Sequence, residues 1–230
     1  MTVRSMERRR RIALYGGTFD PVHVGHTALA RRLLEQFSLD EVLFIPAHVA
    51  PHKRDREVSP ALHRYAMLAL ATQGHERFRV STIELDAPES PYTVGTLERF
   101  VATTGREARL FFVMGADSWQ EITTWREWER VLTLTDIVVV TRPGYEVGTS
   151  HVTPSIRERV VDLRRGRGSF EEALKEEAGG TRIYLSDAVV MDVSATGVRR
   201  AARDGAELGE MVAPPVAEYI GKYSLYQRGA

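Results

Sequence analysis

Short apolar runs alternate with amphipathic stretches of helix length, and this alternation constrains the fold more than any other feature of the sequence. The runs have the length and composition of buried strands, over residues 12–15, 41–46, 77–80, 109–114, 136–141 and 182–185. Helices are predicted over 25–36, 60–73, 93–102, 118–122 and 125–132. This order predicts an α/β fold, a Rossmann-like doubly wound parallel sheet flanked by helices. Ligands of such sheets bind beyond the carboxyl ends of the strands.

The chain ends and one internal segment depart from the alternation. Residues 1–10 are expected to be a disordered leader, with the arginine run 8–11 as a solvated approach to the first strand. Residues 145–181 are expected to be a variable insertion, with a surface helix over 155–163 and a mobile or helical stretch over 164–180. Residues 194–230 form a small C-terminal helical extension with helices over 196–205 and 214–222, which completes a single domain, 1–230.

Composition restricts the classes of partner. Lysine and arginine total 31 residues and aspartate and glutamate also total 31, so no net charge attracts nucleic acid or an anionic membrane. The chain has no cysteine, which excludes disulfides, a thiolate nucleophile and a cysteine zinc site, and makes a cytoplasmic location the default. No segment approaches the roughly 20 apolar residues that span a bilayer. We therefore expect small-molecule partners, no nucleic acid and no membrane.

A glycine-rich loop links the first predicted strand to the first helix. It reads Gly16-Gly17-Thr18-Phe19-Asp20-Pro21-Val22-His23-Val24-Gly25-His26. Backbone N–H groups of such a loop, together with a helix N-terminus, suit a phosphate chain. His23 and His26 are three residues apart, so both rings can donate to phosphate oxygens. Two other interpretations are a capping or core histidine and an H-x-x-H metal pair, the latter disfavoured because no third ligand is suitably spaced.

A second motif lies near the C-terminus and reads Val193-Ser194-Ala195-Thr196-Gly197-Val198-Arg199. Ser194 and Thr196 bring hydroxyls to the start of a helix, and Arg199 adds a cation one turn later. This arrangement indicates a cradle for the β- and γ-phosphates of a nucleotide. An ordinary N-cap followed by a surface arginine is the alternative.

The two motifs resemble, in order, the H-x-G-H and S-x-T-x-x-R signatures of the nucleotidylyltransferase superfamily, in the form found in bacterial nicotinate-nucleotide adenylyltransferases. The resemblance covers most of the chain outside residues 145–181. It continues through Pro51-His52-Lys53, Tyr92-Thr93 with Thr96-Leu97, Gly115-Ala116-Asp117-Ser118, Thr124-Trp125, Arg142-Pro143-Gly144, Tyr219-Ile220 and Leu225-Tyr226. The family often has two asparagines and a second proline where this chain has Ala47, His48 and Ala50.

The resemblance implies transfer of AMP from ATP to nicotinate mononucleotide, with Mg2+ accompanying ATP and no metal site made by the protein. It implies three overlapping sets of residues. The catalytic set is His23, His26, Lys53 and Arg199; the ATP set is Gly16, Gly17, Thr18, Phe19, His23, His26, Asp117, Ser194, Thr196 and Arg199; the nicotinate mononucleotide set is His52, Lys53, Thr93, Trp125 and Arg126.

Within these sets the resemblance also implies individual roles. Trp125 stacks on the pyridine ring, and the backbone N–H groups of Thr93 and Arg126 receive its carboxylate. Asp117 binds ribose hydroxyls, whereas His52 and Lys53 lie over the transferring phosphates.

Each of these roles has an alternative. Trp125 and Trp128 could be core anchors on one helix face, Asp117 a helix N-cap, and residues 47–57 a solvated turn instead of a mobile lid. Rival functions are a pantetheine-phosphate adenylyltransferase or a cytidylyltransferase, which share the phosphate motifs, and a nucleotide sensor without turnover. Assembly into a homo-oligomer is left open.

Overall fold

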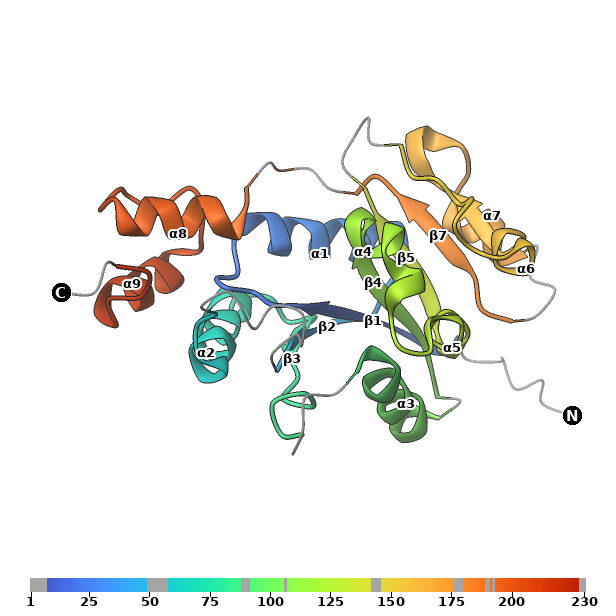
Figure 1. Cartoon of the computed structure of the whole chain (residues 1–230), viewed down its shortest axis with the longest axis horizontal. Helices are drawn as coiled ribbons and strands as arrows, with labels where there is room; N and C mark the ends of the chain where they lie inside the picture. The colour runs from blue at the N-terminus through green and yellow to red at the C-terminus, as the bar shows by residue number, and fades with distance from the viewer. Residues whose placement is uncertain are drawn as a thin grey trace, which may run out of the picture.

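The computed structural model describes residues 8–48, 58–87, 92–105, 107–141, 146–175, 180–188, 191 and 193–227. Within these ranges a seven-stranded sheet has the order β3-β2-β1-β4-β5-β7-β6, and every pairing is parallel (Figure 1). Its strands are β1 (Arg10–Gly17), β2 (Glu41–Pro46), β3 (Phe78–Val80), β4 (Ala108–Gly115), β5 (Asp136–Val140), β6 (Val160–Asp162) and β7 (Ile183–Ser186). The predicted doubly wound parallel sheet is confirmed.

Helices cover both faces of the sheet. One face packs against α1 (Val24–Gln36), α2 (Ala61–Thr72), α7 (Phe170–Lys175), α8 (Ala195–Arg203) and α9 (Pro214–Lys222). The other packs against α3 (Thr93–Thr104), α4 (Ala116–Gln120), α5 (Trp128–Leu134) and α6 (Pro154–Arg157). Neighbouring strand residues alternate between the two cores: Phe111 and Val113 of β4 lie in the first, whereas Leu110 and Phe112 lie in the second. Burial of alternate residues on opposite faces explains why these strands read as continuous apolar runs.

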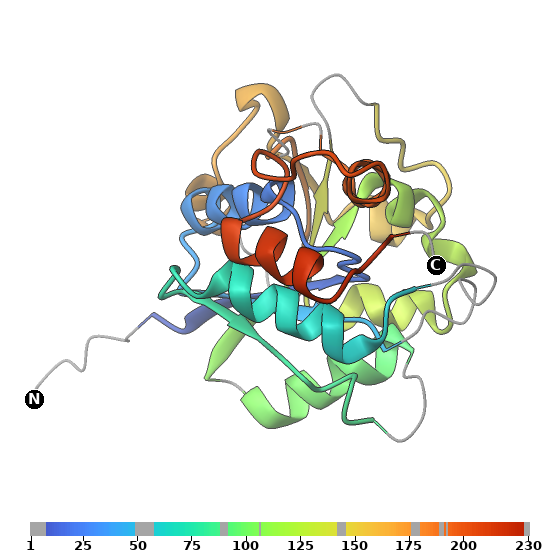
Figure 2. The ribbon, with the colours of Figure 1, turned by 90° about the vertical axis from the view of Figure 1, so that its left-hand side faces the viewer.

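The strand order reverses at β1. From β1 the chain proceeds outward through β2 and β3, then returns to place β4 on the other side of β1. The loops after β1 and β4 therefore leave the same edge on either side of a topological switch point, where open α/β sheets bind their ligands. Two C-terminal helices, α8 and α9, also stand at this carboxyl edge, at the left of Figure 1. In Figure 2, where that end faces the viewer, α9 lies beside α2.

The segment between β5 and β7 differs from its prediction. The expected surface helix over 155–163 is wrong in its second half, because α6 ends at Arg157 and residues 160–162 form the edge strand β6 beside β7. The β-branched pair Val160-Val161 favours a strand. The stretch 164–180, expected to be mobile or helical, contains the 3-10 turn Arg164–Gly166 and helix α7. Phe170 of α7 is 2% exposed and packs on Phe37 and Tyr184, so α7 belongs to the core.

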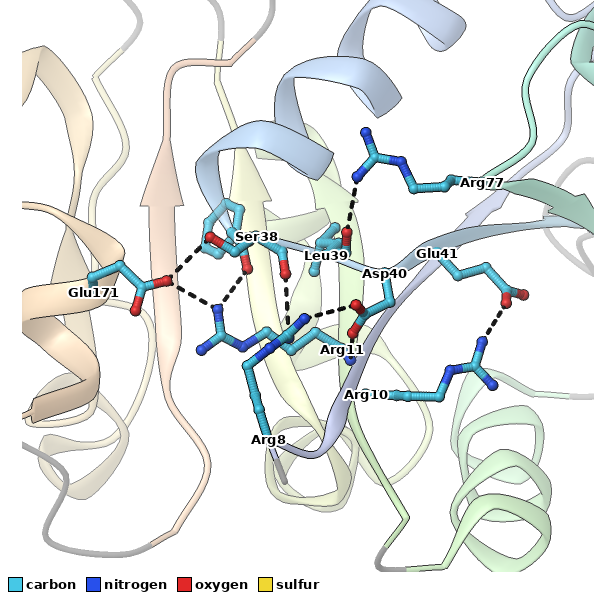
Figure 3. Close-up of polar contacts among 10 residues, drawn as sticks. Arg8, Arg10, Arg11, Ser38, Leu39, Asp40, Glu41, Arg77 and Glu171 are labelled. Carbon is cyan, nitrogen blue, oxygen red and sulfur yellow. Dashed lines mark hydrogen bonds and ion pairs between the residues drawn. The ribbon is translucent and has the colours of Figure 1, made fainter. Parts of the chain in front are cut away.

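The expected leader also ends earlier than predicted. Arg10, although exposed, is the first residue of β1, and Arg11 is 7% exposed inside that strand, so these two residues belong to the sheet. The Arg11 guanidinium contacts the Glu171 carboxylate at 3.0 Å (Figure 3). It also lies 5.0 Å from the centroid of the Phe170 ring. Arg8 donates to Asp40 Oδ1 at 2.7 Å. Residues 1–7 lie outside the described residues. No helix in the described part of the chain is long and apolar enough to cross a membrane.

Candidate active site

The loop between β1 and α1 is shaped by aromatic packing. Phe19 is 3% exposed with a φ of 49°, a left-handed conformation that is uncommon for a bulky residue. Its ring packs on Tyr15, Phe44 and the His26 ring, which hold that conformation. A Cβ added to Gly17 would lie 2.9 Å from the Phe19 ring. The need for glycine at position 17 therefore comes from this close approach.

His23 and His26 form a stacked pair at the start of α1. Their ring centroids are 3.7 Å apart with an interplanar angle of 28°. The His23 backbone N–H donates to His26 Nδ1 at 3.1 Å, which leaves the proton of the neutral His26 ring on Nε2 as a donor. Among the described residues, none hydrogen-bonds to the buried His23 Nδ1. A Cβ on Gly25 would lie 3.1 Å from that nitrogen, so Gly25 allows the His23 ring to pack against the helix.

Both histidines are held neutral by their surroundings. Burial lowers the pKa of His23 to about 4. Burial, followed by the proximity of His23, lowers the pKa of His26 well below its ordinary value. Neutral imidazoles still donate N–H bonds, and an incoming phosphate would favour their protonated forms. The pair therefore offers donors to an anion without a permanent charge.

The second motif begins α8, which confirms its predicted position. Ser194 is the N-cap, and its Oγ accepts from Gly197 N at 3.1 Å. Thr196 Oγ1 accepts from Arg199 Nη2 at 3.2 Å, and Arg199 Nη1 donates to the Asp20 carbonyl at 2.6 Å. This last bond brings the two motifs together, although 179 positions separate them in the chain.

Sequence reasoning missed the residue that fixes the base of the loop. Arg64 of α2 is 1% exposed and donates to three carbonyl oxygens, those of Thr18 at 2.8 Å, His48 at 2.9 Å and Ser59 at 3.0 Å. The signal was available, because Arg64 occupies a buried position on the apolar face of α2. A buried guanidinium needs several acceptors, and here they come from the loop after β1 and from both sides of residues 49–57.

The start of α3, where Thr93 lies, and the segment Trp125-Arg126 are both on the second face of the sheet. The Arg126 guanidinium lies 4.7 Å from the centroid of the Tyr92 ring, which joins the start of α3 to the segment before α5. The Trp125 ring packs on Phe112 at 6.4 Å between centroids. The predicted helix over 125–132 is wrong in its first turn, because Trp125 is extended and α5 begins at Trp128.

Because of this later helix start, Trp125 and Trp128 do not share a helix face. Both rings pack against the second core and remain partly accessible. Trp125 thus lies at the end of a 3-10 turn, beside the segment that carries Tyr92.

Asp117 follows β4 in the first turn of α4 and is exposed. The N-cap of this helix is Gly115, so the alternative that Asp117 is the cap is wrong. Its carboxylate is open to solvent at the carboxyl edge, next to the loop after β1.

The predicted lid is described only at its margins. His52 and Lys53 lie outside the described residues, as do Ala50 and the segment 142–145. At the near margin, His48 N donates to Glu84 Oε2 at 3.4 Å, and Glu84 Oε1 accepts from Thr96 Oγ1 at 2.9 Å. Burial raises the pKa of Glu84. Glu84, which sequence reasoning also missed, links the end of β2 to α3.

No cluster of three or more histidine, aspartate or glutamate side chains suited to a metal occurs in the described part of the chain. Asp20 is the nearest carboxylate to the histidine pair in sequence, and both of its carboxylate oxygens accept hydrogen bonds, from Ser59 N and Tyr226 Oη.

Hydrogen-bond donors thus converge from the start of α1, at the topological switch point, and from the start of α8, which carries Arg199. Groups of these types suit the phosphates of a nucleotide. Together with the doubly wound sheet, they define a nucleotidyltransferase.

Comparisons with known proteins identify the family. The cytidylyltransferase-like family model matches residues 14–201. A probable nicotinate-nucleotide adenylyltransferase of Desulfatibacillum aliphaticivorans is 36% identical over 94% of this chain and 99% of its own length. Another, from Thermoanaerobacter sp. (strain X514), is 35% identical over 97% of both chains. The chain belongs to the cytidylyltransferase-like family and, within it, to the nicotinate-nucleotide adenylyltransferases.

Solved structures share the fold. The nicotinic acid mononucleotide adenylyltransferase of Plasmodium falciparum, complexed with NaAD, has a TM-score of 0.68 over 94% of this chain and 97% of its own, at 17% identity. A putative nicotinate-nucleotide adenylyltransferase of Vibrio parahaemolyticus has a TM-score of 0.60 over 96% of this chain and 97% of its own, also at 17% identity.

Proposed function

We propose that this chain transfers AMP from ATP to nicotinate mononucleotide, giving nicotinate adenine dinucleotide and pyrophosphate in NAD biosynthesis. The observation that carries the proposal is the hydrogen bond from Arg199 to the Asp20 carbonyl. This bond joins the loop of the two histidines to the phosphate cradle of α8, so donors on both elements can act on one triphosphate. The names of the relatives support the choice of acceptor.

The reaction is an in-line displacement at phosphorus. An oxygen of the 5′-phosphate of nicotinate mononucleotide bonds to the α-phosphorus of ATP, and the bond from that phosphorus to the bridging oxygen of the β-phosphate breaks. Pyrophosphate leaves with the electron pair. Because the nucleophile is already an anion, the step needs no general base and no covalent enzyme intermediate. Catalysis then consists of positioning and charge stabilisation.

The side chains divide this work by position. His26 Nε2–H and the His23 ring, at the start of α1, donate to the α-phosphate as its charge develops. Ser194, Thr196 and Arg199 hold the β- and γ-phosphates at the start of α8. His52 and Lys53 add donors from the segment after β2, and the backbone of residues 16–19 lines the phosphate chain. These assignments follow the family motifs and the positions of the described side chains.

Magnesium belongs to the substrate in this proposal. Mg2+ bound together with ATP would neutralise part of the charge of its phosphates. No described cluster of protein carboxylates competes with the phosphates for it. Arg199 and the histidines then supply the donors that do not depend on the ion.

The acceptor is recognised on the opposite side of the switch point. Trp125 stacks on the pyridine ring, and the N–H groups of Thr93 and Arg126 receive the nicotinate carboxylate. The Tyr92–Arg126 contact supports this role because it draws the two backbone segments together. A nicotinamide would turn its NH2 group toward one of these N–H donors, so that two donors face each other and neither has an acceptor. The nicotinate carboxylate is therefore favoured. Asp117 binds ribose hydroxyls of the adenylyl half.

The test is pyrophosphate release from ATP and Mg2+, with nicotinate mononucleotide, nicotinamide mononucleotide, phosphopantetheine and choline phosphate supplied in parallel. Release with the nicotinate compound, and at least tenfold less with the amide, is the expected outcome. Release only with phosphopantetheine or choline phosphate would show that the acceptor is a different compound, whereas the proposed chemistry at the phosphates would stand. Nucleotide binding without release from any acceptor would favour a sensor.

A matched tryptophan pair tests the acceptor site separately. Trp125→Ala should raise the KM for nicotinate mononucleotide by about one order of magnitude and leave the KM for ATP unchanged, as expected for loss of one ring stack. Trp128→Ala removes an equally large ring three residues away and should leave both KM values near those of the parent. Equal effects of the two variants on the acceptor KM would refute the stacking role.

A further inference from the structure

The C-terminal tail reaches the phosphate-binding loop through one side chain. Tyr226 follows α9, and its hydroxyl donates to Asp20 Oδ1 at 2.7 Å across 206 positions of sequence. Leu225-Tyr226 is one of the two pairs of residues near the end of the chain that the proposed reaction leaves without a role. The tail packs where α9 lies beside α2, in the region that Figure 2 shows facing the viewer.

Asp20 joins its own loop to three other parts of the chain. Its Oδ1 accepts from Tyr226 of the tail, its Oδ2 accepts from Ser59 N at 3.1 Å at the start of α2, and its carbonyl accepts from Arg199 of α8 at 2.6 Å. Asp20 is 5% exposed and lies three residues before His23. A rotation of this residue would therefore move the carbonyl that holds Arg199 and the backbone that leads into the histidine pair.

The conformation of the tail shows that its side chain is held firmly. Tyr226 has a φ of 67° and Ser224 a φ of 50°, both in the left-handed region that non-glycine residues seldom occupy. Such a conformation persists where surrounding contacts determine it. The phenol lies against Met67, with 4.0 Å between Oη and Sδ. Burial and the neighbouring Asp20 carboxylate raise the pKa of Tyr226, so the phenol remains a donor across the physiological range.

We infer that Tyr226 is a positioning residue for ATP: its bond to Asp20 orients the Asp20 carbonyl and hence the Arg199 guanidinium that receives the β- and γ-phosphates. The inference rests on the proposed function for the identity of the nucleotide. It differs from a purely structural role because it predicts weaker ATP binding by protein that is fully folded.

The experiment compares Tyr226→Phe with Tyr219→Phe. Tyr219 loses a hydroxyl in the same C-terminal region, but that hydroxyl bonds to His63 Nδ1 at 2.9 Å and touches neither motif. Calorimetric titration with ATP and Mg2+, without an acceptor, gives the dissociation constant of each variant, and thermal unfolding reports the folded fraction. Steady-state assays with nicotinate mononucleotide then separate kcat from the KM for ATP.

Tyr226→Phe should weaken ATP binding about tenfold, a usual size for coupling between linked sites, and leave the KM for the acceptor unchanged. Tyr219→Phe should bind ATP within about twofold of the parent, because its lost bond is remote from the cradle. A lower unfolding midpoint of Tyr226→Phe with the parental ATP affinity would overturn the inference, as would equal weakening in the two variants.

A third variant tests the route through Asp20. Asp20→Asn keeps the shape of the residue and changes the acceptor of the tyrosine hydroxyl, so its effect on ATP affinity should not add to that of Tyr226→Phe in a double-mutant cycle. Full additivity would refute the route. Failure of the parent protein to use nicotinate mononucleotide would contradict the proposed function, whereas the ATP titrations would still decide the role of Tyr226.

Discussion

The two edges of the sheet use charged residues in opposite ways. At the amino edge, arginine and carboxylate side chains pair with each other where strands begin, as Figure 3 shows around β1 and β2. At the carboxyl edge, Arg64 and Arg199 donate to backbone carbonyls, and the histidine pair has no carboxylate partner among the described hydrogen bonds. Paired charges stabilise the sheet, whereas guanidinium groups held by backbone carbonyls and neutral imidazoles suit an anionic ligand.

The amino edge includes one deeply buried pair. Arg109 at the start of β4 donates from Nε to Asp136 Oδ2 at 2.6 Å, and Asp136 is 4% exposed at the start of β5. Arg182 N donates to the other oxygen of Asp136 at 2.7 Å. Removing one partner of such a pair leaves a buried charge without compensation. This edge should therefore control stability and have little influence on turnover.

The largest expected effect is at this buried pair. Arg109→Met should lower the free energy of unfolding by about 3 to 5 kcal/mol, because it removes the guanidinium that hydrogen-bonds to the buried Asp136 carboxylate. Urea unfolding measures this loss. The kcat of the folded variant, assayed well below its melting temperature, should stay close to that of the parent. A large loss of kcat in protein shown to be folded would break the contrast between the two edges.

His26→Ala tests the carboxyl edge. Loss of this donor should raise the barrier to AMP transfer by about 2.7 to 4 kcal/mol, which is a fall in kcat of about a hundred- to a thousandfold. The fall in unfolding free energy should be smaller than that of Arg109→Met. Steady-state kinetics and urea unfolding on one preparation give both values. Near-parental turnover would show that His26 has no part in the chemistry.

The next expected effect concerns pH, through the histidine pair. Because the folded pKa of His23 is about 4 and that of His26 is also lowered, the unfolded chain binds protons at a higher pH than the folded protein does. The stabilisation contributed by the neutral histidines is thus fully present above about pH 6.5 and decreases as pH falls toward 4, by on the order of 3 kcal/mol for His23 alone. The double variant His23→Asn/His26→Asn should show a shallower decrease in urea unfolding. An equal slope would indicate ordinary pKa values.

The smallest expected effect is on the surface of the amino edge. Arg10 contacts Glu41 at 2.9 Å with most of its side chain exposed. Arg10→Ala should change the free energy of unfolding by less than about 1 kcal/mol, because solvent screens such a pair, and should leave kcat unchanged. If Arg10→Ala lowered the free energy of unfolding as much as Arg109→Met does, burial would not explain the difference in stabilisation between the two ion pairs.

Much of the fold follows from local patterns. The six predicted strands appear at nearly their predicted positions, because the inner strands are apolar runs buried on both faces. The edge strand β3 is the exception, since its Arg79 is exposed. Strand β6 was missed because its three residues lie in a charged segment at the sheet edge. The first turn of the predicted 125–132 helix does not form, and Glu127 there has a φ of 51°. Contacts of Trp125 with Phe112 and of Arg126 with Tyr92 override the helical pattern.

The site could be predicted where it depends on local motifs. Ser194 is the N-cap of α8 and His23 is the N-cap of α1, as loop-to-helix patterns indicate. Two sets of hydrogen bonds could not be predicted. The Arg64–Thr18 bond joins residues 46 positions apart, and the Tyr226–Asp20 bond joins residues 206 positions apart. No local periodicity indicates either of them. Such contacts depend on how whole elements pack.

A crystal structure of the protein with nicotinate adenine dinucleotide tests the central claim most directly. The account predicts the product at the β1–β4 switch point, its diphosphate within hydrogen-bond distance of His26, its pyridine ring against Trp125 and its carboxylate on the N–H groups of Thr93 and Arg126. A product bound elsewhere, or a pyridine ring remote from Trp125 with its carboxylate in solvent, would contradict the account.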